Sequence, residues 1–211
     1  MAKLKSRPQM RGRGVSETNP PPPYRGDEGG ESEQPHDFQL ARLGLYIFLG
    51  ALTMMFGALA LLYLLRTPMQ EAFAFQLPRL SWLSTAVILL SSIPCQMALN
   101  AARAGSVVSV ARGTALTFGL GLLFLAMQAG SWSEVAQQLQ GAPVHFFSAM
   151  FYVISAVHGL HLLGGLVFMG YLLYQAFALR IVNPQVVELG AIYWHFLGVL
   201  WAALFAVMLV K

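Results

Sequence analysis

Uncharged stretches of membrane-spanning length recur along this 211-residue chain and restrict its fold more than any other feature. The intervals that lack Asp, Glu, Lys and Arg are 43–65, 80–102, 113–133, 135–179 and 189–210. A helix needs about 20 predominantly apolar residues to cross the hydrocarbon core of a bilayer. The longest interval begins with a polar segment, 137–143, which reads as a loop before one long span. The sequence therefore predicts five transmembrane helices.

The predicted fold class is all-α: a polytopic membrane protein built as a five-helix bundle within residues 39–211. The expected helices cover about 40–65, 80–102, 113–132, 144–179 and 187–210. Charged residues make up only 10% of the chain, whereas soluble domains carry about 25%. A very apolar soluble core is the weaker alternative, because soluble proteins rarely repeat uncharged stretches of this length. Pro94 lies inside the second helix and is expected to kink it.

Residues 1–38 form a separate region with a different composition. The region starts basic, passes through a proline run and then becomes acidic and glycine-rich. It has too few large apolar residues to bury a core, which predicts a disordered tail. No apolar stretch follows the basic start until Leu43, unlike in a signal peptide. The basic residues are expected to hold this tail in the cytoplasm rather than to bind nucleic acid.

Alternation from a cytoplasmic amino terminus predicts the side of each connection. Arg103, Arg112 and Arg180 fall inside, and Glu134 falls outside with the carboxyl terminus. This placement follows the excess of positive charge on the inner side. The connection between Arg66 and Arg79 also falls outside, and its two arginines run against that rule.

Polar residues concentrate in the last two predicted spans. Histidine and glutamate are costly in lipid, so they are expected to face protein and to mark a functional site. The candidate cluster consists of His158, His161, Glu188, Trp194, His195 and Trp201. Residues seven apart share one face of a helix, which aligns Glu188 below His195 and Trp194 below Trp201. A rise of about 1.5 Å per residue puts the three histidines at similar depth, which predicts a buried hydrogen-bond network near the inner side.

Four roles remain open for this cluster: a structural polar clamp, a phospholipid headgroup site, haem ligation or proton transfer. His158 and His161 are three residues apart, so they point the same way and cannot hold one iron from opposite sides. His195 would have to supply the second ligand. No nucleophile with a base, no paired metal histidines and no phosphate loop are visible. The single Cys95 excludes an internal disulfide. No catalytic, cofactor-binding or metal-binding residue is therefore predicted.

Four motifs carry a resemblance to one known family. They are Leu83 to Ser91; Gln128, Trp132 and Glu134, expected as an outer-loop motif; Phe146-Phe147 followed by His158-Gly159-Leu160-His161; and Glu188 with Tyr193-Trp194-His195-Phe196 and Trp201. At these residues the chain resembles subunit III of the haem-copper respiratory oxidases, in the short five-helix form of cytochrome c oxidase subunit III. The resemblance covers about residues 40–211.

The resemblance implies an accessory subunit without redox cofactors in a proton-pumping terminal oxidase of the bacterial inner membrane. The implied partners are subunit II and catalytic subunit I, which holds haem and copper, with phospholipids and supercomplex neighbours as further candidates. Lipid contact would fall to the residues of the candidate cluster. The family's membrane glutamate is absent from 45–63, and Gly198 lies near the place of another family acid, so a proton-uptake role is not implied.

Three alternatives to that function stay open. Within the family pattern, the chain resembles equally a quinol oxidase subunit III or an accessory protein of nitric oxide reductase. From another class, a haem-binding membrane cytochrome would use His158 or His161 together with His195. A small transporter would require charged spans and internal repeats, and the sequence has neither.

Overall fold

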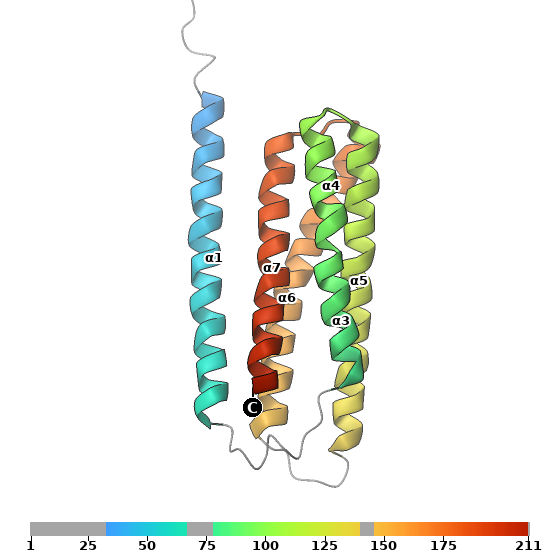
Figure 1. Cartoon of the computed structure of the whole chain (residues 1–211). Coiled ribbons are helices and arrows are strands. Elements are labelled where there is room, and N and C mark those ends of the chain that lie inside the picture. The colour runs from blue at the N-terminus through green and yellow to red at the C-terminus, as the bar shows by residue number, and fades with distance from the viewer. Residues whose placement is uncertain (1–32, 67–77, 140–145, 211) are drawn as a thin grey trace, which may run out of the picture.

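A computed structural model describes residues 33–66, 78–139 and 146–210 (Figure 1). Every regular element in these segments is helical. The elements are α1 (Glu33–Arg66), α3 (Arg79–Leu90), α4 (Ser92–Arg103), α5 (Val107–Gln138), α6 (Phe146–Tyr174), the π-helix η1 (Gln175–Leu179) and α7 (Pro184–Val210).

Five of the described helical stretches are long and apolar enough to cross a membrane, as the sequence predicts. α3 and α4 form one span, and α6 continues through η1 as another. The start of α1, the α4–α5 turn and the η1–α7 connection lie together at one end, drawn at the top of Figure 1. The carboxyl end of α7 lies at the opposite end. The predicted alternation of the spans is therefore confirmed. We call the end at which α1 starts the inner end and the opposite end the outer end, after the orientation that the sequence predicts.

Several helices extend beyond their predicted limits. α1 begins at Glu33, inside the segment expected to be disordered, while residues 1–32 of that segment lie outside the described residues. α5 begins at Val107 and ends at Gln138, well past the predicted 113–132. Lack of charge marks the part of a helix that crosses lipid, not the turns that continue into water. The sequence therefore underestimates α1, α5 and α7 at their polar ends, whereas α6 with η1 stays within its predicted limits.

The extension of α5 corrects one prediction, namely that the Gln128, Trp132 and Glu134 motif lies in an outer loop. Gln128, Trp132 and Glu134 lie on the last turns of α5 rather than in a loop. Val135 is fully buried on the same turns, which gives the helix an apolar anchor beyond Trp132. Glutamate and glutamine favour helix as well, so the polar composition of this segment does not end α5.

The second span is interrupted one turn before Pro94. Proline has no N–H to offer the carbonyl four residues earlier, here that of Leu90, and its ring crowds that carbonyl. The regular helix divides at Ser91, although the N–H of Ser91 still bonds the carbonyl of Val87 at 3.0 Å. The predicted effect of Pro94 is therefore seen as a break between α3 and α4.

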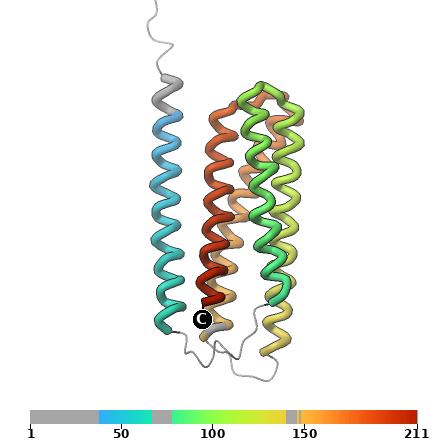
Figure 2. The backbone as a smooth tube through the Cα atoms, in the orientation of Figure 1, coloured from blue at the N-terminus to red at the C-terminus, as the bar shows by residue number. Residues whose placement is uncertain are grey.

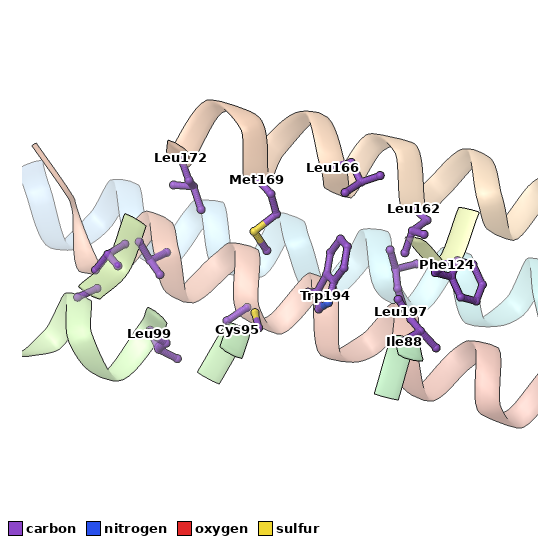
Figure 3. Packing of buried hydrophobic residues seen from close by; sticks show 14 of the residues in the cluster. Ile88, Cys95, Leu99, Phe124, Leu162, Leu166, Met169, Leu172, Trp194 and Leu197 are labelled. Carbon is purple, nitrogen blue, oxygen red and sulfur yellow. The ribbon is translucent and has the colours of Figure 1, made fainter. Parts of the chain in front are cut away.

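The spans pack into a bundle of four, with α1 beside it. α5 contacts α3, α4 and α6, and α7 contacts α3, α4 and α6. α1 lies on the outside of α7 and α6 (Figures 1 and 2). One apolar core surrounds Trp194 inside the bundle, where Leu166, Met169 and Leu197 lie close to its ring (Figure 3). A second core, around Phe56 and Tyr63, joins α1 to the outer halves of α6 and α7.

Candidate functional site

Trp194 occupies a slot between two glycines at the centre of the bundle. A Cβ atom on Gly121 of α5 would lie 2.6 Å from the indole ring, and one on Gly165 of α6 would lie 3.4 Å from it. The indole N–H donates to the Ser91 hydroxyl at 2.9 Å, and that hydroxyl donates to the Ile88 carbonyl at 2.6 Å. The break between α3 and α4 thus provides the partner that a buried tryptophan N–H requires.

Trp201 repeats this arrangement two turns further along α7. Its indole N–H donates to the Thr85 hydroxyl of α3 at 3.0 Å. The two tryptophans share one face of α7, as their separation of seven residues predicts. Because α3 and α7 run in opposite directions, the later tryptophan meets the earlier hydroxyl. Both tryptophans are almost completely buried.

His158 lies in a box of aromatic rings. Its ring centroid is 4.9 Å from that of Trp201, 5.9 Å from Phe124 and 6.2 Å from Phe56. The side chain is fully buried, and both ring nitrogens lack a hydrogen-bond partner among the described residues. The close packing leaves no room for a porphyrin against this ring, so His158 does not fit haem ligation.

The other two histidines lie in different surroundings. His161 Nδ1 is 2.7 Å from the Val157 carbonyl, and its ring is 5.7 Å from that of Phe56. His195 is partly buried, and its Nε2 has no partner among the described residues. No group of three histidine, cysteine or acidic side chains suited to a metal occurs in the described segments. His158 and His161 therefore both lie against the Phe56 ring, whereas no hydrogen bond in the described segments joins His195 to either of them.

Glu188 belongs to an ionic cluster at the inner end. Its carboxylate is 3.1 Å from the Arg103 guanidinium of α4 and 3.8 Å from that of Arg42 on α1. No bond between Glu188 and His195 is recorded in the described chain, so the single network expected near the inner side is wrong. The predicted cluster is instead two groups: the aromatic interior around His158 and the ionic cluster around Glu188.

A cavity of about 440 Å³ separates the inner half of α1 from α6 and α7. It lies directly beside the ionic cluster, because Ala41 and Leu189 are sequence neighbours of the two ion-paired residues of α1 and α7. The lining is almost entirely apolar and consists of Ala41, Leu45, Gly164, Phe168, Leu189, Gly190 and Tyr193. The Tyr193 hydroxyl donates to the His161 carbonyl at 2.8 Å, so one wall of the cavity is tied to α6.

The Gln128 and Trp132 side chains join α5 to its neighbours near the outer end. The Trp132 indole N–H donates to the Ser155 hydroxyl of α6 at 2.9 Å. The Ser84 hydroxyl of α3 lies 3.4 Å from Gln128 Oε1. Glu134 is partly buried near the end of the same helix. These contacts connect three helices and give the motif a packing role in the described structure.

Several residues that shape the site are absent from the sequence-based candidates. Arg42 and Arg103 complete the ionic cluster, and Gly121 and Gly165 make the slot for Trp194. The arginines were readable as span boundaries but not as partners of Glu188. The glycines resemble many others in the chain, and only the position of the indole ring distinguishes them.

The five apolar helices around a tryptophan and histidine interior define a polytopic α-helical membrane protein. A profile of the family described as cytochrome c oxidase subunit III matches residues 66–210. The chain therefore belongs to the cytochrome c oxidase subunit III family. The matched residues cover α3 to α7, whereas α1 contributes only its last residue.

Individual relatives divide between two kinds of oxidase. The chain is 32% identical over 126 residues to a probable cytochrome c oxidase subunit 3 of Mycobacterium tuberculosis, covering 59% of this chain and 62% of that protein. It is 32% identical over 126 residues to the cytochrome bo(3) ubiquinol oxidase subunit 3 of Buchnera aphidicola, covering 59% and 67%. It is 28% identical over 193 residues to the quinol oxidase subunit 3 of Bacillus subtilis, covering 84% and 93%. The match thus spans less than two thirds of the mycobacterial protein.

Proposed function

We propose that this chain is the accessory subunit III of a haem-copper terminal oxidase in a bacterial respiratory membrane. The family match across α3 to α7 is the observation that carries this proposal. The chain contributes no redox group in it; haem and copper belong to the catalytic subunit I, with subunit II as a further partner. The amino terminus faces the cytoplasm, in keeping with Arg42, Arg103, Arg112 and Arg180 at the inner end.

Cytochrome c is the proposed electron donor of the complex, and quinol is the second candidate. The names of the relatives support both, and the quinol oxidase subunit 3 of Bacillus subtilis matches the larger share of this chain. The donor is bound by other subunits, so the distinction has to be measured on the complex.

Affinity capture of the tagged full chain from gently solubilised membranes tests the proposal. We expect a haem-copper catalytic subunit in the eluate, haem bands in the reduced-minus-oxidised spectrum, and oxygen consumption. Reduced cytochrome c and a quinol, supplied separately, identify the donor. Capture of a nitric oxide reductase, or of this chain alone with haem, would refute the terminal oxidase function.

We further propose that the cavity between α1, α6 and α7 holds a phospholipid. Its apolar walls suit an acyl chain, and Arg42 and Arg103 at its inner end suit a phosphate. Of the candidate lipid residues, Glu188 lies next to this cavity, whereas His158, Trp194 and Trp201 are buried inside the bundle and are not part of its lining. His161 contributes its carbonyl to the bond with Tyr193.

Filling the cavity tests the lipid proposal. Gly164→Leu adds a side chain at a position where a Cβ has only the Tyr193 hydroxyl at 4.0 Å. We expect native mass spectrometry of the complex to show one phospholipid fewer. The matched control is Gly50→Leu on α1, where a Cβ meets nothing within 4 Å. Equal lipid counts in both variants would contradict a lipid in this cavity.

A further inference from the structure

Four arginines lie at the inner end of the bundle, and they differ in their partners. Arg42 and Arg103 share the Glu188 carboxylate. Arg112 and Arg180 have no acidic partner in the part of the chain that the structure describes. Within 38–66, 78–139 and 148–210, where the structure describes side chains, the acidic residues are Glu134 and Glu188. Glu134 is 22 residues further along α5 than Arg112, or roughly 33 Å away at the helical rise.

These two arginines line one cavity. It has a volume of about 530 Å³ and lies between the first turns of α5 and the π-helix η1. Its remaining lining is Val107, Val108, Ala111, Ala176 and Phe177. Apolar walls beside two exposed guanidinium groups form an amphipathic pocket at the membrane boundary. The α1 cavity proposed for phospholipid is lined by entirely different residues.

The backbone around Arg180 is unusual. α6 changes from α-helix to π-helix over Gln175–Leu179, and the Ile181 N–H bonds the Gln175 carbonyl at 3.3 Å. Arg180 then adopts a left-handed conformation with φ of 53°. Such a conformation costs about 1 kcal/mol or more for a residue other than glycine. Wide π turns occur frequently at functional sites, and here Arg180, directly after the turn, is part of the cavity lining.

We propose that this α5–η1 cavity binds the headgroup of an anionic phospholipid of the inner leaflet. Arg112 and Arg180 hold the negatively charged phosphate and headgroup, and the apolar walls receive the start of an acyl chain. Two cations that have no carboxylate partner among the described side chains favour a headgroup with net negative charge over a zwitterionic one. The site goes beyond the proposed oxidase function and depends only on the inner-end position of the two arginines.

Lipid binding to the purified, delipidated complex tests this site. The complex is incubated with phosphatidylglycerol, with phosphatidylcholine or with inorganic phosphate, and bound molecules are counted by native mass spectrometry. The test variant is Arg112→Gln with Arg180→Gln. Its control is Arg66→Gln with Arg79→Gln, which removes the same charge at the outer end. Arg180→Asn forms a second variant, because asparagine accepts the left-handed conformation.

We expect the test variant to bind phosphatidylglycerol about thirtyfold more weakly, since each basic residue near an anionic surface contributes about 1 kcal/mol and 1.4 kcal/mol is tenfold. The control should bind it like the native complex, and Arg180→Asn should weaken binding without loss of thermal stability. Equal binding by test variant and control would overturn the proposal. So would equal affinity for phosphatidylcholine, or complete displacement of the lipid by inorganic phosphate.

Discussion

α1 and the α3–α7 bundle both cross the membrane, but different contacts hold them in place. Only 17% of the apolar 18-residue segment of α1 is buried, against 33% to 39% of the corresponding segments in the other spans. The bundle closes around Trp194 with glycine contacts and a buried hydrogen bond. α1 is attached by Phe56 and Tyr63 in its outer half and by Arg42 at its inner end. Interlocking shapes stabilise the bundle, whereas α1 is held at two places with a cavity between them.

Among these substitutions, adding volume beside Trp194 should lower the thermal stability of the bundle most. In Gly121→Leu even the Cβ would lie 2.6 Å from the indole and 2.8 Å from Leu166. Overpacking of this kind costs about 3 kcal/mol, so we expect a marked loss of folded protein. Thermal melting in detergent, followed by fluorescence-detected size exclusion, measures it. Gly119→Leu, two residues away where a Cβ meets nothing within 4 Å, is the control. Equal melting of both variants would show that the slot does not limit packing.

Removing the indole of Trp194 should have the next largest effect. Trp194→Phe loses the hydrogen bond to Ser91 and leaves a small void, which together cost about 2 kcal/mol. Trp82→Phe is the control, because Trp82 is 55% exposed on the lipid-facing surface. The same melting assay should separate the two variants. An unchanged melting temperature in Trp194→Phe would contradict the importance of this bond.

A smaller loss is expected where the bundle forms the wall of the α1 cavity. Tyr193→Phe removes the bond to the His161 carbonyl, worth about 1 kcal/mol. Tyr171→Phe removes an exposed hydroxyl that only accepts from Gln175, and should change melting less. The comparison fails if the exposed substitution is the more damaging of the two.

Neutralising Glu188 should leave the bundle stable and release α1. Glu188→Gln removes the charge shared by Arg42 and Arg103, so the inner half of α1 is expected to move away from α7. Spin labels at the exposed Leu43 and Gln185 report this distance by pulsed electron resonance. Glu134→Gln is the control at the other end of the bundle. A distance distribution that stays narrow in Glu188→Gln would mean that Phe56 and Tyr63 suffice to hold α1.

The sequence predicts the spans and their alternation because lipid selects strongly against charge. Intervals such as 43–65 and 80–102 are therefore readable without any knowledge of packing. The ends of helices carry no comparable signal, and the continuation of α5 to Gln138 was missed for that reason. The expected loop around Glu134 was wrong because polar residues in water can continue a helix.

The sequence identified the tryptophans, histidines and Glu188 of the candidate site, but not how they are grouped or which arginines and glycines complete the groups. Trp194 and Trp201 share a face by spacing alone, and the structure confirms it. Glu188 was grouped with His195 because the two share one face of the last span, yet its partners come from α1 and α4. Long-range pairing of this kind depends on how the helices are arranged, which the spacing within one helix does not contain.

The attachment of α1 has a consequence for the order in which the protein is made. Among the described spans, α1 leaves the ribosome before the others, but its main contacts are with α6 and α7, which follow α3, α4 and α5 in the chain. Membrane helices insert individually before they associate, so α1 waits in the bilayer while α3, α4 and α5 pass. Its exposed apolar face, with Ile47 and Met54, suits this solitary stage. Docking of α1 is therefore expected only after α6 and α7 have inserted, and lipids that surround α1 before then are the first candidates for the cavity beside it.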